Sequence, residues 1–187
     1  MIPESHGDPI HKRARPFKGL SFNKMIPNMI TLLALCAGMS AIRFGFENRW
    51  ELAAFSIVAA AILDTLDGRV ARFLKGSSKF GAELDSLADF ISFGVAPGIM
   101  LYLWALQGSG RFGWILALIF ASCMALRLAR FNTLLDDPDA PAWKANFFSG
   151  TPAPAGAGLA LLPLVLSFQI GDDLVRRPEV VSVVLIL

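Results

Sequence analysis

Charged residues are scarce in this sequence. Asp, Glu, Lys and Arg together make up 17% of its 187 residues, whereas 55% are hydrophobic. An ordinary soluble domain carries about 25% charged residues, so this balance argues against that class and indicates an integral membrane protein. The formal net charge is only +2. The total charge therefore says little about partners, and we expect no nucleic-acid binding.

Residues typical of zinc and copper sites are also few. The chain has two histidines and two cysteines. Cys36 and Cys123 lie inside apolar segments without metal-type spacing, so we interpret them as small buried hydrophobic residues. No repeat, low-complexity tract or linker rich in Pro, Gly and Ser divides the chain. We therefore expect a single domain over residues 1–187.

Long apolar segments predict the fold class. Segments of about 20 residues, enough to cross a bilayer, lie at 26–46, 50–73, 84–107, 112–133 and 152–171. A sixth begins near Glu179 and is cut short at the last residue. No ten-residue stretches alternate as in a membrane barrel, so the spans are expected to be helices. We predict an all-α, polytopic membrane bundle of about six transmembrane helices, truncated at its C-terminus.

The segment before the first span is basic. Residues 1–25 form this leader, and 16–26 mixes aromatic, aliphatic and lysine side chains. That mixture predicts a short amphipathic helix in the headgroup layer. Pro27 is expected at the start of the first membrane helix, because proline is tolerated in a first turn.

The placement of basic residues predicts the orientation. Residues 11–18, 69–79 and 127–144 carry most of the Lys and Arg, and alternating spans put all three segments on one side. The positive-inside rule makes that side cytoplasmic. We expect a bacterial inner-membrane protein whose N-terminus and active site face the cytoplasm.

Four aspartates interrupt the apolar sequence. Asp64 and Asp67 lie near the end of the second span, and Asp85 and Asp89 near the start of the third. Spacings of three and four residues put each pair on one helix face, and a short connection brings the two helices together. An acidic side chain at the bilayer centre costs roughly 2.5–3.5 kcal/mol, so four cost on the order of 10 kcal/mol. This cost favours a functional role.

Oxygen ligands without His or Cys favour Mg²⁺, Mn²⁺ or Ca²⁺. Two acidic helix faces can hold two such ions about 3.5–4 Å apart, an arrangement suited to phosphoryl chemistry. Between the acids, Gly68 and Ala71 leave room for a ligand beside the helix backbone. The Arg72 guanidinium offers donors to phosphate oxygens.

Together these residues read Asp-x₂-Asp-Gly-x₂-Ala-Arg-x₈-Gly-x₃-Asp-x₃-Asp from Asp64 to Asp89. This pattern resembles the signature of the CDP-alcohol phosphatidyltransferases, membrane enzymes that transfer a phosphatidyl or related group from a CDP-linked donor to an alcohol and release CMP. The first span opens 27-PNMIT-31, which is similar to that family's Pro-Asn-x-x-Thr. Segments 85–98, 126–132 and 148–158 resemble the phosphatidylserine synthase branch, which joins CDP-diacylglycerol to L-serine.

The resemblance implies roles for particular residues. It makes Asp64, Asp67, Asp85 and Asp89 the ligands of two divalent cations, Mg²⁺ or Mn²⁺, with Asp89 also the proton acceptor. The predicted contacts to CDP-diacylglycerol are Asn28, Thr31, Gly68, Ala71, Arg72, Ser78 and Gly81. For serine we predict Arg127, Arg130 and Asn132, because a substrate carboxylate favours a guanidinium partner. The resemblance also implies a homodimer.

Two alternatives stay open from the sequence. The acceptor can instead be glycerol 3-phosphate or an inositol phosphate, which requires an additional basic pocket. A divalent-cation transporter would also explain acids inside a membrane. That reading gives no reason for the fixed spacing of Gly68, Ala71, Arg72 and Gly81.

Overall fold

The computed structural model describes residues 22–76, 78–135 and 151–186, and within these ranges the chain forms helices and no strand. The α-helices are α1 (Phe22–Phe46), α2 (Trp50–Phe73), α3 (Lys79–Asp89), α4 (Ala96–Leu101), α5 (Arg111–Leu135), α6 (Ala153–Ala160), α7 (Leu162–Ile170), α8 (Asp172–Val175) and α9 (Pro178–Ile186). Two π-helices, η1 (Phe90–Val95) and η2 (Tyr102–Leu106), and a 3₁₀ turn, η3 (Gln107–Ser109), complete them. The predicted all-α fold is confirmed.

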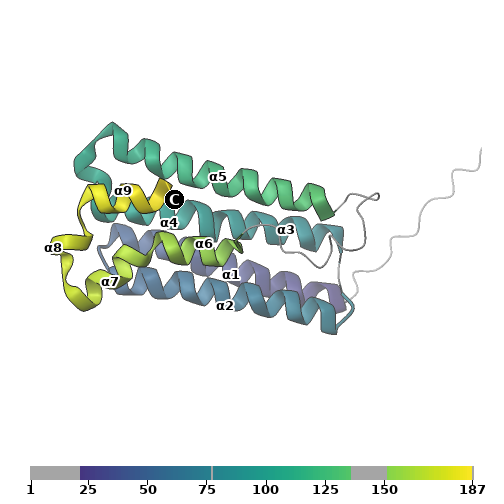
Figure 1. Cartoon of the computed structure of the whole chain (residues 1–187). Coiled ribbons are helices and arrows are strands. Elements are labelled where there is room, and N and C mark those ends of the chain that lie inside the picture. Colours follow the sequence, from purple (N-terminus) through teal and green to yellow (C-terminus); the bar gives the residue numbers. More distant parts are fainter. Residues whose placement is uncertain (1–21, 77, 136–150, 187) are drawn as a thin grey trace, which may run out of the picture.

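The long helices lie side by side as an antiparallel bundle (Figure 1). Residues 47–49 turn the chain from α1 into α2, and residues 74–78 turn it from α2 into α3. α1 packs against both α2 and α3. Consequently the end of α2 and the start of α3 meet at one end of the bundle, next to the beginning of α1.

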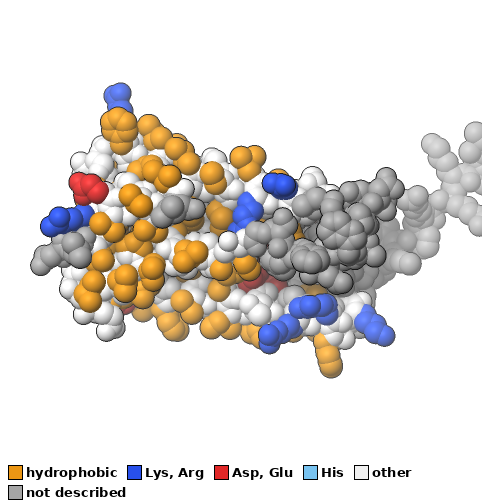
Figure 2. All heavy atoms as spheres, viewed as in Figure 1, with side chains coloured by type: hydrophobic (Ala, Val, Ile, Leu, Met, Phe, Trp, Pro, Cys, Tyr) orange, Lys and Arg blue, Asp and Glu red, His pale blue; other side chains and the backbone are white. Residues whose placement is uncertain are grey.

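The core consists largely of small side chains. Ala41, Ala53, Ala60, Ala96 and Ala157 are fully buried and lie among a few larger residues such as Phe93 and Met100. Large hydrophobic side chains point outward instead: Phe55, Phe112 and Leu126 are 68%, 78% and 72% exposed. Small residues inside and large apolar residues outside are typical of helices that pack closely within lipid. Figure 2 shows hydrophobic side chains over much of the visible face.

Three described segments are long and apolar enough to cross a membrane: Met25–Phe46, Lys79–Ser109 and Arg111–Thr133. α6 and α7 pass the same test as a pair bent by 42°. α2 has a spanning length but carries five charged residues, Glu51, Asp64, Asp67, Arg69 and Arg72. The described helices thus give three or four apolar spans, and the expected count of six stays a prediction.

Two of the apolar spans are not continuous α-helices, and a proline lies at each irregularity. The third span is one helical run interrupted by η1, in which the Ala96 N–H donates to the Ile91 carbonyl, one residue farther than in an α-helix. Pro97 follows directly and has no N–H to continue the α-helical ladder. The bend between α6 and α7 likewise immediately precedes Pro163. Proline is a common cause of sharp helix kinks.

Two local expectations are wrong. α1 already begins at Phe22, so Pro27 lies inside the helix. Cys36 and Cys123 are exposed, which costs little on an outer surface whose surrounding lipid is as apolar as the core. The apolar segment expected at 84–107 lies within a longer helical run that begins at Lys79, where the Ser78 side chain caps α3 by accepting the Gly81 N–H at 3.0 Å. The predicted headgroup helix at 16–26 lies mostly outside the described residues.

Candidate active site

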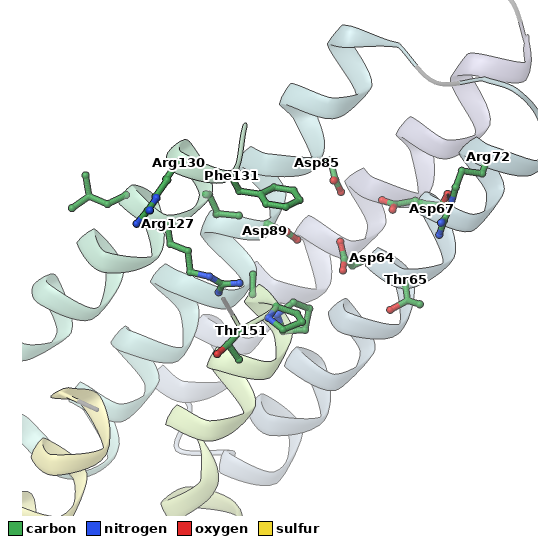
Figure 3. Close-up of a pocket in the computed structure, with 16 residues that line it drawn as sticks. Asp64, Thr65, Asp67, Arg72, Asp85, Asp89, Arg127, Arg130, Phe131 and Thr151 are labelled. Carbon is green, nitrogen blue, oxygen red and sulfur yellow. Dashed lines mark hydrogen bonds between the residues drawn. The ribbon is translucent and has the colours of Figure 1, made fainter. Parts of the chain in front are cut away.

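The four aspartates of the sequence motif come from two neighbouring helices. Asp64 and Asp67 lie one turn apart near the end of α2, and Asp85 and Asp89 one turn apart in α3. Because the α2–α3 connection is only residues 74–78, the two acidic faces stand opposite each other (Figure 3). The predicted convergence of the acids is confirmed.

Three of these carboxylates form a tight group. Asp64, Asp67 and Asp85 each place one oxygen so that all three atoms lie within 4.8 Å of one another. Asp67 is 4% exposed, whereas Asp64 and Asp85 are half-buried. Asp89 is not part of this tight group, but it points toward Asp64 from the same cavity wall (Figure 3).

A hydroxyl from α1 reaches the group. The Thr31 Oγ1 donates a short hydrogen bond to Asp67 Oδ2, and both side chains are buried. Thr31 Oγ1 also lies 3.0 Å from the Pro27 carbonyl, four residues earlier in the same helix. α1 therefore contacts the acid cluster directly.

The acids line a cavity of about 790 Å³. Its opposite wall includes Arg127 and Arg130 from α5, with Arg127 extending into the space between α5 and the acids (Figure 3). Neither guanidinium forms an ion pair with any described carboxylate. The cavity thus has an anionic wall and a cationic wall. Such a site suits a ligand that carries charges of both signs.

Comparison with known proteins identifies the family. Residues 24–187 match the family model described as CDP-alcohol phosphatidyltransferase. The chain belongs to the CDP-alcohol phosphatidyltransferase family. Among curated relatives named CDP-diacylglycerol–serine O-phosphatidyltransferase, the Mycobacterium leprae protein is 49% identical over 148 residues, which cover 79% of this chain and 49% of that protein. The Helicobacter pylori protein is 40% identical over 142 residues, covering 76% of this chain and 58% of that protein.

A protein of the same name from Mycobacterium tuberculosis is 47% identical over 149 residues, 80% of this chain and 52% of that protein. The chain spans about half the length of these curated relatives. Together with its apolar helices, membership of this family makes the protein an integral membrane protein.

The structure brings together some of the residues predicted from the family resemblance. The cavity is lined by the four aspartates and by Gly68, Arg72, Arg127 and Arg130. Asn28, Thr31, Ala71, Ser78, Gly81 and Asn132 are not among the lining residues. The Asn132 Nδ2 instead donates to Ser86 Oγ at 2.9 Å, which ties the end of α5 to α3.

Asn28, Ser78 and Gly81 lie together where α1 meets α3. A Cβ atom added at Gly81 would stand 3.0 Å from Asn28 Oδ1 and 3.2 Å from Ser78 Oγ. Gly81 therefore permits a close approach of the two helices at the base of the acid cluster. Whether these residues contact a donor stays a prediction.

Several lining residues are missing from the sequence prediction. These are Thr65, Leu126, Leu128, Phe131, Thr151, Pro152, Ala153 and Pro154. Thr151 and Pro152 lead into α6, and Ala153 and Pro154 are its first two residues. Three more of these residues, Leu126, Leu128 and Phe131, are adjacent in sequence to the predicted Arg127 and Arg130. This adjacency is the feature of the sequence from which they could have been predicted as lining residues.

The acid group fits a hard divalent cation. Its ligands are carboxylate oxygens alone, without His or Cys, which is the donor set that Mg²⁺ and Mn²⁺ prefer. Asp64, Asp67 and Asp85 would hold such an ion, and Asp89 lies beside them.

Proposed function

We propose that this protein transfers the phosphatidyl group of CDP-diacylglycerol to the hydroxyl of L-serine, forming phosphatidylserine and CMP. One observation carries the proposal: four aspartates on α2 and α3 and two arginines on α5 line a single cavity, and Arg127 extends into the space between α5 and the acids (Figure 3). Family membership and the names of the relatives support the same reaction.

The cavity walls suit the two substrates. Gly68 and Arg72 lie on the α2 wall beside the acids, where an open backbone and a guanidinium favour a diphosphate. Arg127 and Arg130 on the facing wall suit the carboxylate of serine. The Arg127 and Arg130 pair would also accept a phosphorylated acceptor, so the acceptor is the part of the proposal that an assay must decide.

A second, mostly apolar cavity adjoins the first. It has a volume of about 470 Å³ and lies between α2 and the α6–α7 pair, and Thr65 and Pro154 line both cavities. Its wall includes Ile57, Val58 and Leu161. This groove would take an acyl chain of the donor while the polar head stays beside the acids.

The reaction is a displacement at phosphorus. The serine oxygen forms a bond to the diacylglycerol-bearing phosphorus, the bond from that phosphorus to the CMP oxygen breaks, and CMP leaves as an anion. Asp89 accepts the proton of the serine hydroxyl. Asp64, Asp67 and Asp85 with Asp89 would hold two Mg²⁺ or Mn²⁺ ions, which when bound neutralise charge on the phosphate oxygens. The cavity walls hold hydroxyl and phosphorus in reach of each other.

The proposal places the site at the cytoplasmic face of a bacterial inner membrane. Arg69, Arg72, Lys75 and Lys79 lie at the same end of the bundle as the acids, and the positive-inside rule assigns that end to the cytoplasm. There CDP-diacylglycerol can enter from the lipid and serine from water. We further propose a six-span core and a homodimer, as the family resemblance implies.

The test is CMP release by the purified full chain in lipid nanodiscs. CDP-diacylglycerol and Mn²⁺ are supplied with serine, glycerol 3-phosphate or an inositol phosphate, and CMP and the lipid product are measured by mass spectrometry. We expect phosphatidylserine and CMP in equal amounts. Release with glycerol 3-phosphate and not with serine would show that the acceptor assignment is wrong.

Two variants separate a role of Asp89 in the reaction from a general effect of removing a negative charge. Asp89→Asn is expected to abolish CMP release while the protein stays folded. Glu83→Gln is the matched control, because Glu83 lies on the same helix, is exposed and does not line the cavity. It should release CMP at the wild-type rate. Near-normal release by Asp89→Asn would remove Asp89 from its proposed role.

A further inference from the structure

Among the described residues, Thr31 makes a side-chain hydrogen bond from α1 to the acid cluster. Thr31 and Asp67 are each only 4% exposed. They lie 36 residues apart in the sequence and on different helices. Thr31 is absent from the cavity lining, whereas Asp67 is part of it. The hydroxyl therefore faces the back of a carboxylate whose front faces the cavity.

The chemistry of the two groups fixes the direction of the hydrogen bond. A threonine hydroxyl has one proton, and an ionised carboxylate can only accept. A threonine inside a helix commonly gives its proton to the carbonyl four residues earlier, here Pro27 at 3.0 Å. The stronger acceptor is the charged one. Thr31 thus donates to Asp67 Oδ2, and this bond restrains the position of that oxygen.

α1 also meets α3 close to Thr31. The Asn28 side chain lies beside Gly81 at the start of α3, and α1 contacts both acid-bearing helices. The Thr31 hydroxyl therefore cannot shift unless α1 moves relative to α2 or α3. The Thr31 hydroxyl is therefore a fixed partner for Asp67.

We propose that Thr31 is a positioning residue that holds the Asp67 carboxylate ready for a divalent cation, rather than a contact to the nucleotide donor. The inference rests on the proposed function for the presence of a cation in the site. Partners that orient metal-binding side chains typically change metal affinity by about 10- to 100-fold when they are removed. The same range is expected here.

The decisive experiment compares cation binding with donor binding. Full-length protein in nanodiscs is stripped of metal and titrated with Mn²⁺, and free Mn²⁺ is followed by electron paramagnetic resonance without any substrate. Thr31→Val keeps the shape of the side chain and removes the hydroxyl. It should raise the Mn²⁺ midpoint by about 10- to 100-fold. At saturating Mn²⁺ its KM for CDP-diacylglycerol should stay at the wild-type value.

Two further variants serve as rescue and control. Thr31→Ser restores the hydroxyl and should restore the Mn²⁺ midpoint. Ser40→Ala removes a hydroxyl of the same helix that donates to the Cys36 carbonyl at 2.7 Å, and it should leave the midpoint unchanged. If Thr31→Val does not fold, Thr31→Ala removes the hydroxyl without a branched side chain and takes its place.

The opposite pattern would overturn the inference. If removal of the hydroxyl leaves the Mn²⁺ midpoint unchanged and raises the KM for CDP-diacylglycerol, Thr31 contacts the donor. If wild-type protein binds Mn²⁺ but releases no CMP with any acceptor, the proposed function fails while the Thr31 comparison still stands. If wild-type protein binds no Mn²⁺, with or without CDP-diacylglycerol, the positioning role is wrong.

Discussion

Replacing Gly68 by alanine tests whether CDP-diacylglycerol contacts the backbone of α2 at this position. Gly68 lies next to Asp67 and lines the main cavity. A Cβ atom added there meets no other heavy atom within 4 Å. The methyl group therefore enters open space at the cavity wall and disturbs no helix contact. Because alanine is favoured over glycine inside a helix by about 0.8–1.0 kcal/mol, the variant should be as stable as wild type or more so.

The expected loss is in donor binding. If the donor lies against the Gly68 backbone, one added carbon in a filled contact costs about 1–3 kcal/mol. At about 1.4 kcal/mol per tenfold change, this raises the KM for CDP-diacylglycerol by roughly 5- to 150-fold. The KM for serine and the Mn²⁺ midpoint should change little. CMP release in nanodiscs with a varied mole fraction of CDP-diacylglycerol gives these values, and thermal unfolding gives the stability.

Gly108→Ala is the matched control. A Cβ atom at Gly108 also meets nothing within 4 Å, and η3 lies at the opposite end of the bundle from the acids. Its kinetics should equal those of wild type. A Gly68→Ala protein that is stable and keeps the wild-type KM for CDP-diacylglycerol would refute the donor contact, because the added methyl would then meet no ligand.

Three other predictions concern packing, the acceptor and the cation. Gly38→Ala should destabilise the protein by about 1–3 kcal/mol in thermal or denaturant unfolding, because the added Cβ would stand 2.7 Å from the Ser92 Cα; unchanged stability would contradict that close packing. Arg127→Gln should raise the KM for serine by roughly 10- to 100-fold, the equivalent of one charged hydrogen bond, and an unchanged KM would remove Arg127 from the serine site. Chelation should stop CMP release, and Mn²⁺ should restore it in wild type but not in Asp85→Asn; activity that survives chelation would argue against a cation.

The acid cluster could be predicted from the sequence because acidic side chains inside a membrane-spanning segment cost free energy. Asp64, Asp67, Asp85 and Asp89 interrupt apolar segments, and their spacing fixes the helix face on which each pair lies. The short α2–α3 connection then leaves one arrangement in which the two pairs meet. The insertion cost of the acids, their helical spacing and the length of the α2–α3 connection can all be read from a short stretch of sequence. The sequence alone was therefore sufficient to predict that the acids converge.

The partners of these acids could not be predicted in the same way. The Thr31 contact to Asp67 depends on the rotation of α1 about its own axis, and the Asn132 contact to Ser86 depends on how far α5 reaches along α3. Neither follows from residue type or spacing. The π-helical turns of the third span could not be predicted either, because the hydropathy of a segment does not change when its hydrogen bonds shift by one residue.

The rotation of α1 nevertheless has a physical basis in its own sequence. Thr31, Ala34, Gly38, Ala41 and Gly45 recur every three or four residues, and all five are buried. Small residues on one stripe let a helix approach its neighbours closely, and at Gly38 the neighbour is the backbone of Ser92. Thr31 is the polar end of this stripe and lies two turns before Gly38, on the same face. The packing that turns the glycines and alanines inward therefore also brings the Thr31 hydroxyl to Asp67, so helix packing and the geometry of the acid cluster depend on one face of α1.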